Sequence, residues 1–356
     1  MARSDRRHAC TTDIWDRDPW LLCTPAGTVD LRTGSMRENR REDLITKVTT
    51  VGPCGECPLW GRFLGQIFDG DQDLIAFVQR MLGYCLTGVT REHALFFCYG
   101  LGGNGKGTLL NTFAGILGDY ATTAPKGMFE EAKSERHPTD LAGLRGARAV
   151  ISQETEQGTR WAETLVKTLT GGDPVAARFM RQDFFEYVPA FKLLISGNHK
   201  PQLRDVTEAM RRRLHFIPFN RTIGKAERDT ELAEKLKPEW PAILRWAIDG
   251  CLEWQRIGLA PPAAVREATS AYFVEQDAVA GFLAENCMTD KPNAVEETGE
   301  LFSRFTAWCD YKGKTRISTM AFVAKIDEHG FKRGRDRTGR SQFRGIRMAP
   351  QPWMYF

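Results

Sequence analysis

No stretch of the 356-residue sequence approaches the roughly 18 consecutive apolar residues that a membrane-spanning helix needs. The first residues, up to Cys10, are polar and basic and lack the apolar segment of a secretory signal. Nine cysteines are scattered without a framework, and no second CxxC pair accompanies Cys54 and Cys57 at the spacing of a zinc site. These absences argue against a membrane partner, a disulfide scaffold and a zinc module, and they predict a cytoplasmic protein with reduced thiols.

Net charge is only +4, but positive charge is concentrated near the C-terminus. Between Lys312 and Arg347 there are eleven Lys and Arg against three Asp and Glu, which is +8 in that segment and about −4 elsewhere. A basic segment is the electrostatic signature of a nucleic-acid contact. A solvated positive face has the same composition, so charge alone leaves both interpretations open.

Strand-like and helix-like segments alternate in the middle of the chain. Short apolar runs end near residues 99, 153, 196 and 219, and helical periodicity separates them. This alternation predicts an α/β fold with a mainly parallel, covered sheet. A helical collar is expected before the sheet, and a small winged-helix-like module at the end of the chain. The expected segments are 1–90 (N-terminal segment and collar), 91–222 (sheet core), 223–290 (helices) and 291–356 (basic module).

Glycines are concentrated where one of these strands meets a helix. The segment GLGGNGKG follows the apolar run 94–99 and precedes a helical pattern. This spacing fits a phosphate-binding loop, in which backbone N–H groups and a helix N-terminus surround phosphate oxygens and a lysine neutralises them. The expected nucleotide-binding residues are Gly100, Gly102, Gly103, Asn104, Gly105, Lys106, Gly107 and Thr108.

The loop lacks the Ser or Thr that normally follows the lysine and binds Mg²⁺. Gly107 occupies that position, and Thr108 comes one residue later. Either Thr108 supplies the hydroxyl or water takes its place. We expect ATP and Mg²⁺ as ligands, with Thr108 and Glu154 on the metal.

Acidic and amide side chains follow two further strands. Glu154 and Glu156 come after the run 147–153, and alternate residues of an extended chain share one face. Since open α/β sheets place their sites at the carboxyl ends of strands, one glutamate is expected to hold Mg²⁺ and the other to polarise the attacking water. Asn198 follows the run 191–196, where its amide can orient that water or contact the γ-phosphate.

Three consecutive arginines precede the last apolar run of this region, in AMRRRLHFIPF. The planar, permanently charged guanidinium suits phosphoryl oxygens, and an arginine offered by a neighbouring subunit would couple hydrolysis to assembly. Arg212 and Arg213 are the candidates. The alternative is a solvated basic helix end.

In identity, order and spacing these motifs resemble the superfamily 3 helicase part of phage and plasmid primase-helicases, which are related to poxvirus and parvovirus replication helicases. The resemblance runs from about Asp13 to Phe219 and includes GLGGNGKG, ISQETE, KTLTGGD…ARFMRQDFF, LLISGNHKP and AMRRRLHFIPF. It implies an AAA+ type P-loop ATPase whose hexameric ring moves 3′ to 5′ along one DNA strand. It also implies a DNA-gripping hairpin, here within 175–188.

The resemblance assigns roles to individual residues. The catalytic set would be Lys106, Glu154, Glu156, Asn198 and Arg212 or Arg213, and the DNA contacts would be Lys167, Arg178 and Arg181. Only about 58 residues precede the collar, where long members of the family carry a primase domain. We therefore expect no primer synthesis by this chain, with a separate primase or loader as partner, or a chain that is a remnant or a shortened piece.

These expectations describe a replicative helicase of a phage, prophage or plasmid, acting on single-stranded and forked DNA in a bacterial host cell. Two alternatives are kept. One is a DNA-stimulated P-loop ATPase that remodels protein–DNA complexes without unwinding. The other is an origin-binding protein that does not hydrolyse its nucleotide.

Overall fold

The computed structural model describes residues 14–131, 138–153, 158–204, 206–314 and 316–350. The chain forms two compact units. The core unit comprises Met1–Pro201 and Glu208–Thr269, and the C-terminal unit comprises Gln202–Thr207 and Ser270–Phe356. The helical segment expected at 223–290 is therefore divided between the two units, because its last helix packs with the residues that follow it.

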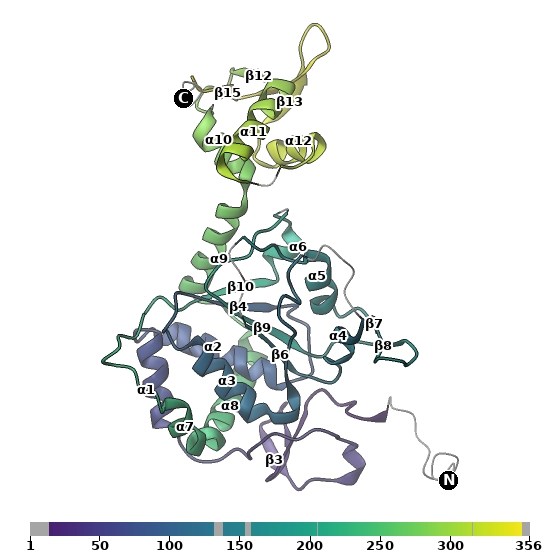
Figure 1. The fold of residues 1–356 in the computed structure, drawn as a ribbon, viewed down its shortest axis with the longest axis vertical. Helices are drawn as coiled ribbons and strands as arrows, with labels where there is room; N and C mark the ends of the chain where they lie inside the picture. Colours follow the sequence, from purple (N-terminus) through teal and green to yellow (C-terminus); the bar gives the residue numbers. More distant parts are fainter. Residues whose placement is uncertain (1–13, 132–137, 154–157, 205, 315, 351–356) are drawn as a thin grey trace. The chain divides into compact units, whose positions relative to one another are not determined.

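A five-stranded sheet forms the centre of the core unit (Figure 1). Its order is β10-β4-β9-β6-β5, and every neighbouring pair is parallel. The predicted α/β fold with a mainly parallel sheet is confirmed. The strands are β4 (Leu95–Tyr99), β5 (Ala121–Thr123), β6 (Ala149–Gln153), β9 (Lys192–Gly197) and β10 (Leu214–Pro218).

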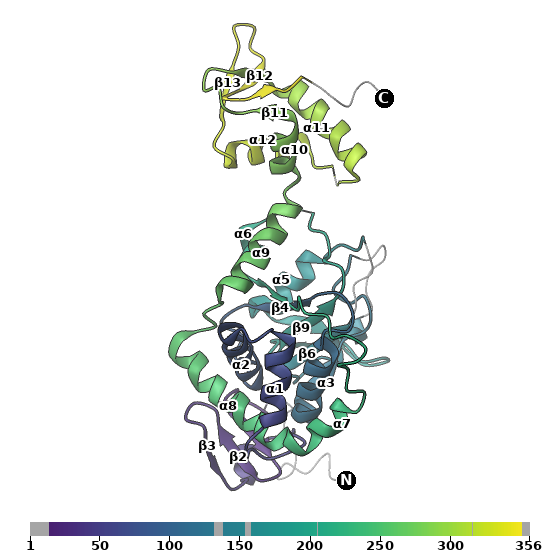
Figure 2. The same ribbon diagram turned by 90° about the vertical axis from the view of Figure 1, so that its left-hand side faces the viewer.

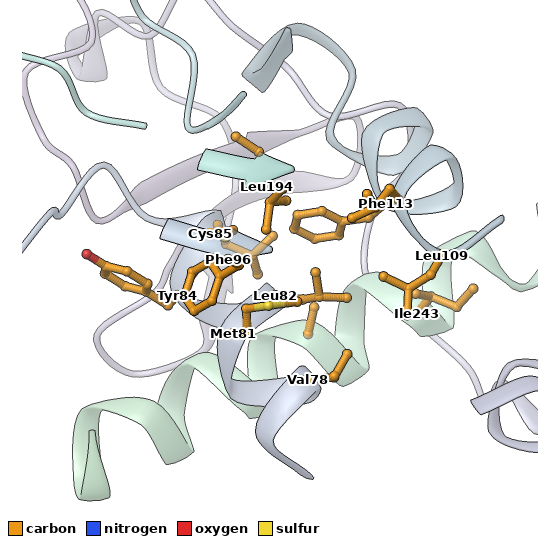
Figure 3. Packing of buried hydrophobic residues seen from close by; sticks show 14 of the residues in the cluster. Val78, Met81, Leu82, Tyr84, Cys85, Phe96, Leu109, Phe113, Leu194 and Ile243 are labelled. Carbon is orange, nitrogen blue, oxygen red and sulfur yellow. The ribbon is translucent and has the colours of Figure 1, made fainter. Parts of the chain in front are cut away.

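Helices lie on both faces of this sheet (Figures 1 and 2). Phe96 and Leu194 join the cluster formed with the helices of one face, as Figure 3 shows. Phe97, one residue along β4, instead contacts Trp161 and Phe216 on the other face. Burial on both faces explains why the strands are continuous apolar runs rather than alternating patterns. The helices of the first face are α1 (Pro58–Ile67), α2 (Gln72–Leu86), α3 (Lys106–Leu117) and α8 (Trp240–Ile257), and α5 (Glu163–Gly171) lies on the second.

Helices α2 and α8 approach closely enough for their backbones to touch. A Cβ on Gly83 would lie 2.1 Å from the backbone nitrogen of Cys251, and a Cβ on Gly250 would lie 2.2 Å from the carbonyl oxygen of Gln79. Only glycine fits at either position, since both neighbours are backbone atoms. This crossing fixes the helical layer beneath the sheet.

A separate antiparallel sheet precedes the helices: β1 (Leu21–Thr24), β2 (Gly27–Asp30) and β3 (Ser35–Arg37). The buried guanidinium of Arg148 donates to the carbonyl oxygens of Leu21 and Leu86, and so ties this sheet to the end of α2. The other elements of the core unit are η3 (Arg41–Asp43), η4 (Gly118–Tyr120), α4 (Pro138–Ala142), β7 (Val175–Ala177), β8 (Phe185–Tyr187), α6 (Glu208–Arg211), α7 (Leu232–Leu236) and η5 (Lys237–Glu239).

The C-terminal unit has its own apolar core, which includes Phe282, Phe305, Phe322 and Phe343. Three helices are followed by an antiparallel hairpin whose strand β14 lies between β12 and β13. The elements are α10 (Ala278–Asn286), β11 (Cys287–Met288), β12 (Val295–Glu297), α11 (Thr298–Lys312), α12 (Thr319–Glu328), β13 (Lys332–Arg335), β14 (Ser341–Arg344) and β15 (Arg347–Met348). Helix α9 (Ala263–Gln276) contains the boundary between the units. Across the described part of the chain, no helix combines the length and apolar character required to traverse a bilayer.

Candidate functional site

Strand order brings the ends of three motif-bearing strands together. Strand β9 lies between β4 and β6, so Tyr99 is paired with Gly197, and Gln153 with Ser196. The glycine loop follows β4, and Asn198 follows β9. Motifs that are far apart in the sequence therefore meet at the carboxyl edge of the sheet, the usual location of a site in such folds.

The glycine loop has a backbone that side chains would disrupt. Gly103 and Gly105 have φ values of +75° and +84°, in the left-handed region that favours glycine. A Cβ on Gly105 would also lie 2.5 Å from Cγ2 of Ile67 in α1, and a Cβ on Gly100 would lie 2.3 Å from the carbonyl oxygen of Phe219. These glycines meet both a conformational and a packing requirement.

Lys106, the first residue of α3, lies at the centre of the site. Its Nζ donates to the carbonyl oxygen of Gly100 at 2.6 Å, to Oδ1 of Asn104 at 3.0 Å and to Oδ1 of Asn198 at 3.3 Å. Burial lowers the pKa of this ammonium below its usual value. Phosphate oxygens would offer it charged acceptors in place of neutral ones, which favours the protonated form.

The segment after β10 folds back over the glycine loop, and we call residues 219–228 the strap. The backbone nitrogen of Ile223 donates to the carbonyl oxygen of Gly103 at 2.8 Å, and Nδ2 of Asn104 donates to that of Phe219 at 3.2 Å. Arg228 donates from Nε to the carbonyl oxygen of Ile223. A Cβ on Gly103 would lie 2.1 Å from Nη2 of Arg228. Arg228 was not predicted from the sequence, since no motif surrounds it.

Two cavities flank the loop. One, of about 380 Å³, is polar, and Lys106, Asn198 and Gln153 lie in its wall. The other, of about 460 Å³, has an apolar wall that includes Phe63, Ile223 and Leu232, with Arg62 and Arg228 beside them. Gly103, Gly105 and Thr108 border both cavities. The first suits phosphates, and the second suits a base and its sugar.

The described residues supply only part of the predicted metal site. Thr108 borders the polar cavity, while a Cβ on Gly107 would have no atom within 4 Å. No three His, Cys, Asp or Glu residues converge as metal ligands within the ranges that the structure covers. Glu154 and Glu156 lie outside the described residues. Thr108 is therefore the candidate hydroxyl donor, and the carboxylate donors stay a prediction.

The candidate arginines differ in their surroundings. Arg213 is 7% exposed, with Nε donating to Oγ1 of Thr170 at 3.0 Å and Nη1 donating to the carbonyl oxygen of Ala209 at 2.8 Å. Arg212 is exposed, and its side chain makes no hydrogen bond or ion pair with another described residue. Arg213 therefore links α5 to the segment before β10 within this chain, whereas the side chain of Arg212 is accessible.

The hairpin β7–β8 carries exposed apolar side chains as well as cations. Phe179, Met180 and Phe184 are 40%, 70% and 60% exposed. The guanidinium of Arg178 lies over the ring of Phe184, 4.8 Å from its centre, and Arg181 is exposed at the turn. Both arginines were predicted from the sequence as DNA contacts, and the aromatic residues were not, although the segment FMRQDFF contains them.

The hairpin is hydrogen-bonded to helix α4. The Tyr187 hydroxyl donates to the carbonyl oxygen of Leu141 in α4 at 2.7 Å. The third predicted DNA contact, Lys167, lies on α5 in an ion pair with Glu163 at 3.5 Å, one helical turn away. That pair is partly exposed and therefore weak, which leaves the ammonium able to exchange partners.

Comparison with protein families gives two matches. A family described as "D5 N terminal like" matches residues 1–69, and a family of unknown function (DUF5906) matches residues 98–213. The second range contains the glycine loop, Asn198 and the arginine triplet. The first match includes helix α1, and the second includes strands β6 and β9 and the end of β4.

Curated relatives include viral proteins that are described as putative helicases. "Putative helicase L207/L206" of Acanthamoeba polyphaga mimivirus is 24% identical over 84% of this chain and 34% of its own length. "Putative helicase 022R" of Frog virus 3 (isolate Goorha) is 27% identical over 69% of this chain and 27% of its own length. The chain thus spans about a third of the length of these relatives, and they support a helicase-type function.

Solved structures show the same fold. The A form apo structure of the NrS-1 C-terminal region (305–718) matches with a TM-score of 0.50 at 12% identity, covering 83% of this chain and 77% of that one. The likeness extends over most of both chains, at a level of identity that relates architecture rather than activity.

Proposed function

We propose that this chain, which is similar to viral putative helicases and to a D5 family model, hydrolyses ATP and uses the energy to move along single-stranded DNA and separate forked duplexes. One observation carries the proposal: the Lys106 ammonium joins the glycine loop to Asn198 in the wall of a polar cavity at the carboxyl edge of the sheet. That arrangement is suited to the phosphates of a nucleotide.

ATP would lie across the loop. The phosphates occupy the polar cavity, and their oxygens replace the neutral acceptors of the Lys106 ammonium. The base and sugar rest against Phe63 and Ile223 in the apolar cavity. Thr108 and Glu154 would hold Mg²⁺, which supplies positive charge to the β- and γ-phosphate oxygens. Arg228, above Gly103, borders the apolar cavity at the loop and so lies near the sugar and the phosphates.

Hydrolysis requires groups on both sides of the γ-phosphate. Glu154 or Glu156 polarises the attacking water, and Asn198 orients it from the end of β9. Arg212 of a neighbouring subunit stabilises the charge that develops, and it is preferred over Arg213 because its side chain is exposed and uncommitted. Such an arginine raises the rate by about 10³–10⁵, so hydrolysis would depend on ring assembly. A hexamer moving 3′ to 5′ is the form that we propose.

The β7–β8 hairpin would hold the strand. Arg178 and Arg181 supply charge for phosphates, Lys167 on α5 is the third proposed contact, and Phe184 offers a face for a base. Stacking combined with charge binds single strands without reading their sequence.

The proposal is tested by a forked-duplex unwinding assay run beside ATPase measurements on single-stranded DNA. The wild-type protein is expected to unwind forks that carry a 3′ tail, and Lys106→Ala is expected to abolish both activities. Arg213→Lys is measured beside Arg212→Ala, because Arg213 makes contacts within its own chain and Arg212 is the proposed contact with the neighbouring subunit's nucleotide. Mixing Arg212→Ala subunits with Lys106→Ala subunits should restore hydrolysis, because each contributes what the other lacks.

Other outcomes contradict the proposal in distinct ways. Hydrolysis without unwinding would favour an ATPase that remodels protein–DNA complexes. DNA binding that survives both Lys106→Ala and Glu154→Gln, with no hydrolysis by the wild-type protein, would favour an origin-binding protein with a structural nucleotide.

A further inference from the structure

Helix α12 of the C-terminal unit corresponds in position to the helix with which many DNA-binding proteins contact DNA, but its exposed charged side chains are acidic. It follows α11 as the second helix of a helix–turn–helix, which usually enters the major groove. Its exposed charged residues are Asp327 and Glu328. Its only cation, Lys325, has a side chain that is 12% exposed and donates to the carbonyl oxygen of Val206 at 3.1 Å. Lys325 also pairs with Glu328 at 3.5 Å, so the helix offers phosphates no uncommitted cation.

The positive charge of the unit lies instead on the hairpin that follows, residues 331–348, which we call the wing. It contains seven Lys and Arg against one Asp, a net charge of +6. All seven cations are exposed: Lys332, Arg333, Arg335, Arg337, Arg340, Arg344 and Arg347. Among the described residues only Arg340 pairs with a carboxylate, that of Glu297 at 3.3 Å, and this pair is exposed and weak.

The single acidic residue of the wing is used to build its turn. The carboxylate of Asp336 accepts from the backbone nitrogens of Thr338 and Arg340 at 2.8 Å and 2.9 Å, and from the Thr338 hydroxyl at 2.8 Å. The Asp336 nitrogen donates to the carbonyl oxygen of Arg340, and Gly339 closes the turn with a φ of +87°. The negative charge is directed at the backbone, and the arginines around it face solvent.

Strand register places like charges opposite each other. Lys332 on β13 is the cross-strand partner of Arg344 on β14, so their side chains share a face, while Phe343 points into the core. Like charges in this position oppose strand pairing. An anion bound between them would remove that cost.

The wing has no exposed aromatic face. Phe343 is fully buried, Phe331 is half-buried, and no Trp or Tyr occurs between them or up to Met348. Surfaces that hold single strands combine charge with aromatic stacking, whereas duplexes present continuous phosphate backbones and stacked bases. A four-residue strand such as β13 spans about 13 Å, close to the roughly 12 Å width of a major groove. Cations at its base and tip can therefore contact phosphates on both sides of a groove.

From these observations we infer that the wing is a binding surface for duplex DNA, that it contacts the phosphate backbone without reading base sequence, and that α12 stays outside the groove. This inference goes beyond the ATPase and does not use its site. The Lys106→Ala variant, which tests the proposed function, should bind duplex as the wild-type protein does. The two ideas can therefore fail separately.

The experiment compares two variants of equal charge change in the full chain. The wing variant carries Arg335→Gln, Arg337→Gln and Arg344→Gln. The control variant carries Lys237→Gln, Arg245→Gln and Arg256→Gln, which are exposed cations of the core unit. Binding to two blunt 20-base-pair DNA duplexes of unrelated sequence is followed by fluorescence anisotropy across a salt series. Circular dichroism and thermal melting check that both variants are folded.

We expect the wing variant to lose about tenfold or more in duplex affinity near 100 mM salt, with the salt slope falling by about 0.9 for each lost phosphate contact. The control variant should retain both, and the two duplexes should bind alike. Met320→Ala, on the exposed face of α12, should bind as the wild type does.

Three results would overturn the inference. Equal duplex binding by the wing and control variants would mean that the wing is a solvated positive surface that does not bind DNA. A large loss with Met320→Ala, or a strong preference for one duplex, would show that α12 reads the groove. Unchanged duplex binding together with lost binding to phosphatidylserine vesicles would assign the wing to anionic lipid.

Discussion

Among the described residues, the β7–β8 hairpin and the wing both present exposed arginines, and they differ in what accompanies these cations: the two arginines of β7–β8 are matched by Asp183 and Glu186, whereas the wing has a net charge of +6. Around the β7–β8 turn, Arg178 and Arg181 are interleaved with exposed phenylalanine and methionine, and one guanidinium lies over an aromatic ring. The wing carries seven cations and buries its aromatic residues. Positive charge by itself attracts any nucleic acid. Exposed aromatic faces decide whether unstacked bases or a closed helix is the better ligand.

The largest expected effect comes from removing an aromatic face from β7–β8. Phe184→Ala should weaken single-stranded DNA binding by about 1–3 kcal/mol, roughly five- to 150-fold, because base stacking contributes that much per base. Phe184→Trp should retain affinity. Titration with a labelled oligonucleotide measures both, with blunt duplex as comparison. An equal loss for single strand and duplex would contradict the distinction between the hairpins.

The salt dependence of DNA affinity should also distinguish the two hairpins, with a smaller expected effect. Arg337→Gln should lower the salt slope for duplex by about 0.9 and leave that for single strands unchanged, and Arg178→Gln should lower the single-strand slope by about 0.7. The measurement is affinity for each ligand at four salt concentrations. Slopes that move together for both ligands would mean that the hairpins share one binding surface.

Replacing one cation by another is expected to matter only where an aromatic ring lies beneath it. Arg178→Lys keeps the charge but loses the planar contact with Phe184, so single-strand affinity should fall by about 0.5–1 kcal/mol. Arg337→Lys on the wing should change duplex affinity by less than about twofold. If both exchanges are neutral, the stacked geometry on β7–β8 is not used in binding.

The smallest expected effect concerns the wing turn. The Thr338 hydroxyl and backbone lower the pKa of Asp336, so the carboxylate keeps its turn hydrogen bonds at every pH above its ordinary pKa and loses them only as pH falls through the lowered value. Duplex binding should therefore show no step from this residue between pH 5 and pH 8. Asp336→Asn, compared with the wild type across that range, should change affinity by no more than about twofold.

Much of the core could be predicted because its signals are local. Continuous apolar runs specified buried strands, and the glycine spacing specified the loop between one of them and α3. Parallel pairing then required Asn198 and the loop to share an edge of the sheet. The distance from Asn198 to Lys106, 3.3 Å, agrees with that expectation.

What could not be predicted depends on partners far away in the chain. Arg212 and Arg213 are alike in local sequence, and they differ in burial and in partners: Arg213 is buried and donates to Thr170 in α5, while Arg212 is exposed. The strap is held by hydrogen bonds to the glycine loop, for which no sequence pattern exists. The burial of Lys192 could not be predicted either, because its ammonium donates to the carbonyl oxygens of Thr87 and Val89, which are far away in the sequence. Burial lowers the pKa of Lys192 to about 7.

The backbone contact between α2 and α8 has a consequence for the synthesis of the protein. Helix α2 leaves the ribosome early. Its packing partner α8, which contacts it at Gly250, is translated only after all strands of the central sheet have been made. At about 5–20 residues per second, the apolar side of α2 waits roughly ten to thirty seconds for its cover. In a chain that ends at residue 222, α8 is missing and the apolar side of α2 stays uncovered. Fragments meant to isolate the ATPase must therefore extend past Ile257, the end of α8, to be recovered in folded form.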